Sequence, residues 1–135
     1  AILNVKLAHY PKDLALRQKV AEQYTNIFQE DSSVSCILPF MLDKVSSSWA
    51  QYSVRIKNRD EVQAYLKDKG VPTAVHYPMP LHLQECFRYL GYKKGAFPIS
   101  ELISEEIMSL PMNPYLDINE MIYITKLLKE SFNAK

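Results

Sequence analysis

The chain has 135 residues, of which 47% are hydrophobic and 23% charged, as is typical of a single soluble globular domain. Sixteen basic and 15 acidic residues leave a net charge of +1 and are scattered along the chain, so the sequence predicts no nucleic-acid partner. No apolar run approaches the ~18 residues of a membrane span and no signal-peptide pattern occurs, so we expect no membrane association. The two cysteines, Cys36 and Cys86, match neither a disulfide framework nor a zinc site, and we expect reduced core residues of a cytoplasmic protein.

A long amphipathic helix is predicted over residues 2–30. Its apolar residues recur in steps of three, four or seven: Leu3, Leu7, Tyr10, Leu14, Ala21, Tyr24 and Phe28. Pro11 lies inside this stripe, so we expect a kink or a restart of the helix there. No initiator Met and no capping residue precede the stripe, and we therefore expect the chain to be part of a longer protein. Residues 1–30 would then be a linking helix that covers its own sheet or also contacts a neighbouring domain.

Alternating apolar residues predict strands in residues 31–135, the expected small domain. The segment VSCILPF (34–40) places four residues on one face: Val34, Cys36, Leu38 and Phe40. The segment SWAQYSVRIK (48–57) does the same with Ala50, Tyr52, Val54 and Ile56. The short link between them predicts an antiparallel pair, and Trp49, which breaks the alternation, is expected at a sheet edge or an interface. A third short strand, TAVHYP (73–78), is predicted after the next helix.

Four helices complete the predicted fold. Asn58 and Glu61 resemble a capping box for a helix over 58–70 that ends at Gly70, with Val62, Tyr65 and Leu66 facing inward. A short helix ends at Gly91, and Ser100 is placed to cap another with the stripe Ile99, Ile103, Ile107 and Leu110. Asp117 and Glu120 begin the last helix, whose stripe is Met121, Ile124, Leu128 and Phe132. The predicted class is α+β, with a short sheet of about three strands packed with helices.

The segment VHYPMPLH (75–82) concentrates residues that can bind a ligand. If residues 73–77 are extended, His76 and Tyr77 point to opposite faces, and Pro78 and Pro80 restrict the backbone that follows. Imidazole and phenol groups suit a polar organic ligand with hydroxyl groups or an anion. The alternative is that Tyr77 is a core residue and His76 a surface residue with its hydrogen bonds satisfied.

Other kinds of site have little support in the sequence. Cys86 lies four residues from His82, but its apolar neighbours favour packing over a thiol nucleophile. The two histidines of VHYPMPLH lack further ligands at metal-binding spacing, so we expect no metal site. The only close glycine pair, GYKKG (91–95), is more simply a helix end and a solvated turn than a phosphate-binding loop.

Two stretches carry a resemblance to a known family. AQYSVRIKNRDEVQAYLKDKGVPTAVHYPMPLHLQ (50–84) and FPISELISEEIMSLPMNPYL (97–116) resemble the C-terminal domain of the DegT/StrS-type sugar aminotransferases. Even AILNVKLAHY is similar to the family helix that follows the cofactor-bearing domain. Asn113 departs from the pattern, because many members carry histidine or an aromatic residue there.

The resemblance implies the small C-terminal domain of a fold-type-I aminotransferase that uses pyridoxal phosphate (PLP). Such enzymes transfer an amino group, typically from glutamate, to a nucleotide-linked keto-sugar, and they act as homodimers. The segment TAVHYPMPLH (73–82) is most similar to the corresponding segment of the subgroup that acts on UDP-linked 3-keto-N-acetylglucuronic acid, in the biosynthesis of cell-surface glycans. The cofactor lysine and the phosphate ligands belong to the preceding large domain, so no catalytic or cofactor-binding residue is expected in this chain, and no PLP is expected to bind to it.

The resemblance also assigns substrate-side residues. His76 and Tyr77 match the residues that the small domain places over the sugar, and His82 is a secondary candidate. Arg55 and Arg59 could bind an acidic substrate group, although Arg55 fits an outward strand residue and Arg59 a surface residue at a helix start. A different hypothesis is a stand-alone small-ligand-binding or dimerisation module without catalysis, since small α+β domains also serve those roles.

Overall fold

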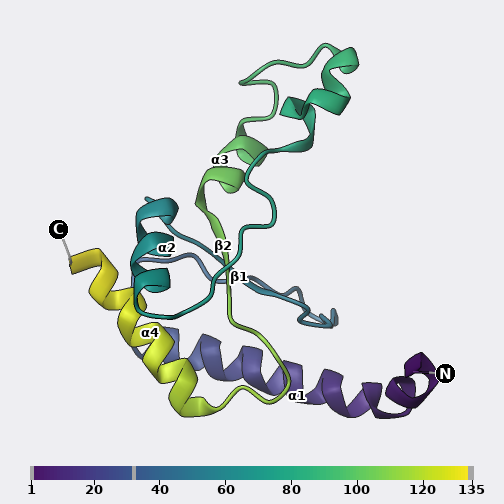
Figure 1. Cartoon of the computed structure of the whole chain (residues 1–135), viewed down its shortest axis with the longest axis vertical. Helices are drawn as coiled ribbons and strands as arrows, with labels where there is room; N and C mark the ends of the chain where they lie inside the picture. The colour runs from purple at the N-terminus through teal and green to yellow at the C-terminus, as the bar shows by residue number, and fades with distance from the viewer. Residues whose placement is uncertain (1, 32, 134–135) are drawn as a thin grey trace.

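The long N-terminal helix is present. The computed structural model describes residues 2–31 and 33–133, so the predicted segments 1–30 and 31–135 include four residues that lie outside the described chain. Helix α1 (Ile2–Glu30) is continuous through Pro11. Its second half contributes Val20, Ala21, Tyr24 and Phe28 to the core, whereas Leu3 is 79% exposed and Leu7 67% exposed. The apolar stripe therefore extends onto a surface that the described residues leave open (Figure 1).

The sheet is smaller than predicted. It consists of β1 (Tyr52–Arg55) and β2 (Ile107–Leu110), which are antiparallel, with Tyr52 opposite Leu110. A single bridge extends each edge: Ile37 pairs with Arg55, and Ala74 pairs with Ser109. The α+β class is confirmed, but the prediction of about three strands is not, because segments 34–40 and 73–78 each contribute one bridge rather than a strand.

Strand β2 was predicted as the end of a helix. Helix α3 (Pro98–Glu106) begins at Pro98, with Phe97 rather than Ser100 before it, and ends before Ile107. The four residues of β2 fit both a helical stripe and a buried strand, and periodicity cannot distinguish these in so short an apolar run. Pairing with β1 decides the outcome, because buried backbone N–H and C=O groups need partners.

Helices α2 (Arg59–Asp68) and α4 (Ile118–Asn133) follow their predicted boundaries. At the end of α2, Gly70 adopts φ 78° and donates its N–H to Lys67, while the N–H of Val71 bonds to Leu66. At the start of α4, Glu120 accepts the backbone N–H of Asp117 at 2.9 Å, as the capping box requires. The predicted capping box at Asn58 is wrong, since its side chain makes no cap hydrogen bond and its φ is 57°.

One face of the sheet packs against the helices. Tyr52, Val54, Met108 and Leu110 alternate onto this face and are all buried, and the ring of Tyr52 stacks on that of Tyr24 at 5.0 Å. Trp49 also packs here, 7% exposed, and its Nε1 donates to Gln18 Oε1 on α1 at 2.6 Å. Its predicted position at a sheet edge or an interface stays a prediction. Phe40 and Ala50, which were expected to face inward, are exposed. The opposite face carries Ser53, Arg55, Ile107 and Ser109.

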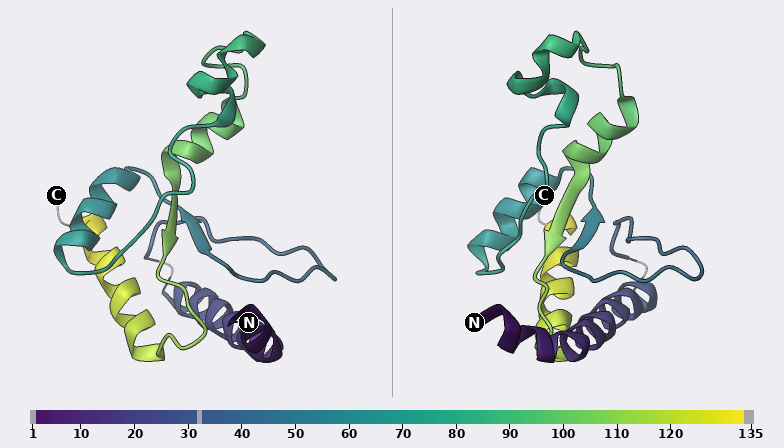
Figure 2. Two further views of the ribbon diagram at one scale, coloured as in Figure 1. Left: turned by 45° about the vertical axis from the view of Figure 1, so that its right-hand side comes forward. Right: turned by 90° about the vertical axis from the view of Figure 1, so that its right-hand side faces the viewer.

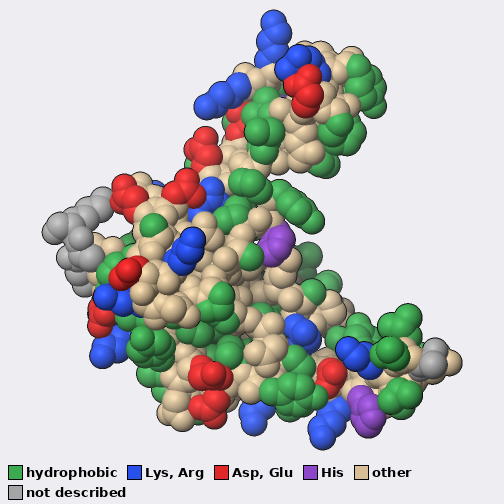
Figure 3. Space-filling view, in the orientation of Figure 1, with side chains coloured by type: hydrophobic (Ala, Val, Ile, Leu, Met, Phe, Trp, Pro, Cys, Tyr) green, Lys and Arg blue, Asp and Glu red, His purple; other side chains and the backbone are tan. Residues whose placement is uncertain are grey.

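An arm, defined as residues 78–97, projects from the rest of the molecule together with α3 (Figure 2). The predicted short α-helix here is instead two 3₁₀ turns, η1 (Leu81–Leu83) and η2 (Glu85–Leu90), which end at Gly91. Cys86 on η2 is exposed, which contradicts its predicted core position. Hydrophobic side chains gather on the arm and at the N-terminal end of α1 (Figure 3), including Leu81, Tyr89 and Leu90 at 50–79% exposure.

Candidate functional site

The His76–Tyr77 pair lies beside the open face of the sheet. Ala74 pairs directly with Ser109, so His76, two residues further on, lies on the same face as the serine side chain. The His76 Nδ1 atom is 3.3 Å from the Ser109 hydroxyl oxygen. Tyr77 follows through a cis peptide bond, is 72% exposed, and meets the imidazole edge to face at 5.8 Å. The alternative in which Tyr77 is a core residue is therefore wrong.

A shallow groove of about 190 Å³ opens next to this pair. Segment 76–84 forms one wall, and α3 with the start of β2 forms the other; the lining residues are His76, Tyr77, Met79, Pro80, Leu81, Gln84, Ser100, Ile103, Ser104 and Ile107. Small-molecule sites usually enclose ~300–1,000 Å³. The groove is therefore large enough for only part of an organic ligand and can serve as one wall of a larger site.

Both candidate arginines are engaged within the protein. Arg55 donates from Nε and Nη2 to Glu106 Oε2, at 3.0 and 2.7 Å. Arg59 is only 6% exposed, which contradicts its predicted surface position. Its Nη1 donates to the backbone oxygens of Ser104 and Ile107, so this guanidinium stabilises the wall of the groove rather than facing a ligand.

His82 lies at the base of the arm and is not among the groove-lining residues. It is buried, its Nε2 is 2.9 Å from Glu101 Oε1, and its ring packs on Phe97 at 4.8 Å. Glu101 also accepts the backbone N–H groups of Gly95 and Phe97. The hydrogen bond from Gly95, together with that from His82, holds the pKa of the Glu101 carboxyl below its ordinary value. This pair fastens both ends of the arm to α3.

Three serines near the groove were missed by sequence reasoning: Ser100, Ser104 and Ser109. Ser109 is 5% exposed and contacts both His76 and Ser53. The sequence pattern places Ser109 in a helix, and a helix would not bring it next to His76, 33 positions away. Asn113, the departure from the family pattern, uses its side-chain oxygen to accept the backbone N–H of Tyr115 at 2.8 Å.

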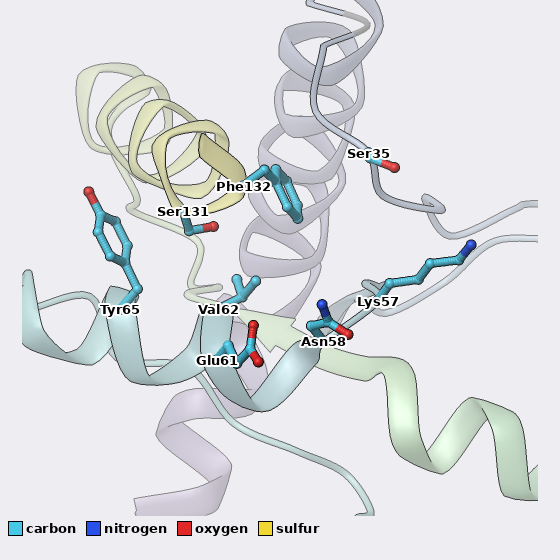
Figure 4. Close-up of a pocket in the computed structure, with 8 residues that line it drawn as sticks. All are labelled: Ser35, Lys57, Asn58, Glu61, Val62, Tyr65, Ser131 and Phe132. Carbon is cyan, nitrogen blue, oxygen red and sulfur yellow. The ribbon is translucent and has the colours of Figure 1, made fainter. Parts of the chain in front are cut away.

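A second cavity, of about 320 Å³, lies between α2, the end of α4 and Ser35 (Figure 4). Val62 and Phe132 contribute apolar surface, and the Lys57 side chain extends away from them. The cavity shares no lining residue with the groove beside His76. Within residues 2–31 and 33–133, no cluster of three or more His, Cys, Asp or Glu side chains is placed to hold a metal ion. None of the described helices is long and apolar enough to cross a membrane.

Comparison with known proteins decides the family. The profile of the DegT/DnrJ/EryC1/StrS aminotransferase family matches residues 1–129. The chain belongs to this family. The chain is 44% identical over 117 residues to the UDP-2-acetamido-2-deoxy-3-oxo-D-glucuronate aminotransferase of Pseudomonas aeruginosa, a match that covers 87% of the chain and 31% of that protein. It is 39% identical over 132 residues to the "pleiotropic regulatory protein" of Geobacillus stearothermophilus, covering 98% of the chain and 36% of that protein.

The fold agrees with this membership. A DegT/DnrJ/EryC1/StrS aminotransferase from Brucella abortus superposes with a TM-score of 0.83 at 32% identity, over 98% of the chain and 34% of that structure. The chain thus spans about a third of the length of the relatives that it matches. The superposition covers 98% of the chain and therefore includes most of the arm, α3 and the two-stranded sheet.

Proposed function

We propose that this chain is the C-terminal part of a PLP-dependent aminotransferase that transfers an amino group from an amino acid, such as glutamate, to a nucleotide-linked keto-sugar. In this proposal residues 1–30 form a linking helix, residues 31–135 form the small domain, and a preceding large domain binds the cofactor. The family membership and the coverage of about a third of each relative support this division. Exposed apolar residues on α1 and on the arm provide surface for contacts with the large domain and with a second copy of the enzyme.

The cofactor chemistry lies outside this chain. The groove beside His76 contains no lysine, so it has no amino group that could hold an aldehyde cofactor. PLP supplies the electron sink for amino transfer when it is bound to the enzyme. The residues of this chain bind and orient the substrate, and the arm and α3 shield one side of it from water.

The observation that carries the proposal is the arrangement of His76 and Tyr77. The imidazole Nδ1 lies 3.3 Å from Ser109, and His76 lines the groove, which supports a role for the other ring nitrogen, Nε2, in binding a ligand. The phenol of Tyr77 is exposed and offers a hydroxyl donor together with a ring that can pack on a sugar. His82 plays an indirect part, because it holds the arm through Glu101.

The proposed substrate class is a UDP-linked 3-keto-N-acetylglucuronate. The support is the 44% identity to a relative that is named as an aminotransferase of a UDP-linked 3-oxo-glucuronate. The carboxylate, acetamido and phosphate oxygens of such a sugar nucleotide are mainly hydrogen-bond acceptors. They complement an imidazole N–H and a phenol O–H, which donate.

The test uses the full-length protein that carries this sequence. We expect His76→Ala and Tyr77→Phe to lower kcat/KM for the sugar nucleotide by about 10- to 100-fold, the effect of losing a hydrogen bond to a charged group. PLP retention should be unchanged. Tyr123→Phe is a matched control, since Tyr123 is exposed on α4 and is not among the residues that line the groove. An equal loss of PLP from the His76 and Tyr77 variants would refute the substrate-side assignment.

The isolated 135-residue chain tests the division between domains. When it is mixed with PLP, we expect neither transaminase activity nor a stoichiometric absorbance band of protein-bound PLP, because the cofactor lysine is proposed to lie in the large domain. A stoichiometric band that disappears on substitution of one lysine would contradict this. Specific binding of a sugar nucleotide by a complete gene product of this length would instead favour the stand-alone binding module.

A further inference from the structure

Three polar side chains from distant parts of the sequence meet on the open face of the sheet. The hydroxyl oxygens of Ser53 and Ser109 are 2.9 Å apart, and Ser109 Oγ is 3.3 Å from His76 Nδ1. The three residues belong to β1, β2 and the segment that follows Ala74. They form a continuous row that begins at the half-buried Ser53 and ends at the imidazole in the groove.

The position of Ser109 in this row is fixed by the sheet. Its backbone N–H donates to Ala74 at 2.7 Å, and its backbone oxygen accepts from Ala74 at 3.1 Å. The backbone groups of Ser109 therefore point away from β1, and Ser53 and Ser109 form a non-hydrogen-bonded pair, the type in which side chains approach most closely. Because Ser109 is 5% exposed, solvent does not compete for its hydroxyl.

The hydroxyl of Ser109 has one hydrogen to donate and two neighbours that can accept it. If Ser53 donates to Ser109, the hydrogen of Ser109 goes to His76 Nδ1, and a neutral imidazole then carries its own hydrogen on Nε2. The opposite direction would place the imidazole hydrogen on Nδ1 and leave Nε2 as an acceptor. Neutral histidine intrinsically favours the Nε2–H tautomer. The first direction, in which Ser109 donates to His76 Nδ1, agrees with this preference.

We propose that Ser109, supported by Ser53, is a positioning residue that holds the His76 ring in the groove with its hydrogen on Nε2. This inference rests on the proposed function, since it specifies His76 as a donor to an acceptor oxygen of the sugar nucleotide. Neither serine needs to touch the substrate. Their role is to fix the orientation and the tautomer of the group that does.

The first measurement reads the tautomer directly. Long-range ¹H–¹⁵N spectra of the chain, at alkaline pH where imidazoles are neutral, distinguish a protonated ring nitrogen from a bare one. We expect His76 to carry its hydrogen on Nε2, and Ser109→Ala to shift the population toward the Nδ1–H form. Ser109→Thr keeps the hydroxyl and should preserve the original tautomer. Exposed His9 serves as the internal control, because its signals should not respond to either variant.

Ser53→Ala provides a second route if Ser109→Ala fails to fold. Without Ser53 the hydrogen of Ser109 has only His76 Nδ1 as an acceptor, so the Nε2–H form should persist or increase. In the full-length protein, Ser109→Ala should lower kcat/KM for the sugar nucleotide by roughly 3- to 10-fold, the effect of one neutral hydrogen bond, with restoration in Ser109→Thr. A His76 tautomer with hydrogen on Nδ1 in the wild type or in Ser53→Ala, or a tautomer population that Ser109→Ala does not change, would overturn the inference. A tautomer shift combined with full activity of His76→Ala would leave the positioning intact and refute the proposed function instead.

Discussion

Arg59 offers a sharp test of how the groove is held. It is the first residue of α2, yet its guanidinium reaches the end of α3, where Nη1 donates to Ile107 O at 2.7 Å and to Ser104 O at 3.3 Å. The last carbonyls of a helix have no partner within the helix, and a cation is favourable beside them. Arg59→Ala removes both of these hydrogen bonds at once, together with the contact between Nε and the exposed carboxylate of Asp60, and leaves the two carbonyls without this donor.

The cost can be worked out from these contacts. A hydrogen bond from a charged donor contributes about 1.5–3 kcal/mol, and the 3.3 Å contact lies at the weak end of the range. We therefore expect Arg59→Ala to lower the free energy of unfolding by about 2–4 kcal/mol. For a chain of this length that corresponds to a fall in Tm of roughly 10 °C. Because Ser104 and Ile107 line the groove, its wall should also loosen.

Urea and thermal unfolding of the chain, followed by circular dichroism, measure the effect. Arg88→Ala is the matched control, because Arg88 is 78% exposed and its exposed partner Glu85 contributes at most about 0.5 kcal/mol through a surface ion pair. Arg59→Lys should fall between the two, since an ammonium lacks the planar fork of Arg. If Arg59→Ala and Arg88→Ala cost the same within about 0.5 kcal/mol, the reasoning about Arg59 is refuted.

Two further predictions concern pH. Burial raises the pKa of Tyr52 to about 12, above the ordinary 10.0. The stabilising contribution of the neutral phenol is therefore complete below pH 10 and declines as the pH rises toward 12. In Tyr52→Phe the free energy of unfolding should fall less steeply between pH 10 and 12. The pKa of Glu101 is held below 4.5 by Gly95 and His82, so its contribution is present above that pH and is lost as the carboxylate is protonated on further acidification. The protection factors for amide hydrogen exchange in the arm, which correct for the pH dependence of intrinsic exchange, should therefore fall on acidification. An arm in Glu101→Gln whose protection responds to acid as the wild type does would contradict this.

Part of the fold could be read from local sequence patterns. The boundaries of α2 and α4 follow from Gly70 and from the Asp117–Glu120 capping box, because these signals act over three or four residues. The inward faces of Tyr52 and Val54 follow from the two-residue period of a strand. The prominence of His76 and Tyr77 also needed only the composition of one short segment.

Other features depend on contacts between distant residues. Ile107–Leu110 is a strand because β1, more than 50 positions earlier, supplies its hydrogen-bond partners, and no local period reveals that pairing. Arg59 is buried because the end of α3 lies against the start of α2. The carbonyl groups at the end of α3 need hydrogen-bond donors, and the Arg59 guanidinium supplies them.

The candidate site divides in the same way. The amino-acid sequence by itself determined that an imidazole and a phenol stand side by side in a proline-restricted segment and that the chain resembles the aminotransferase family. Only the tertiary structure decided that His82 is hydrogen-bonded to Glu101, whereas His76 lines a groove and contacts the Ser109 hydroxyl. The physical reason is that residue types and spacing specify which groups are available, whereas burial and hydrogen-bond partners depend on which distant segments pack together.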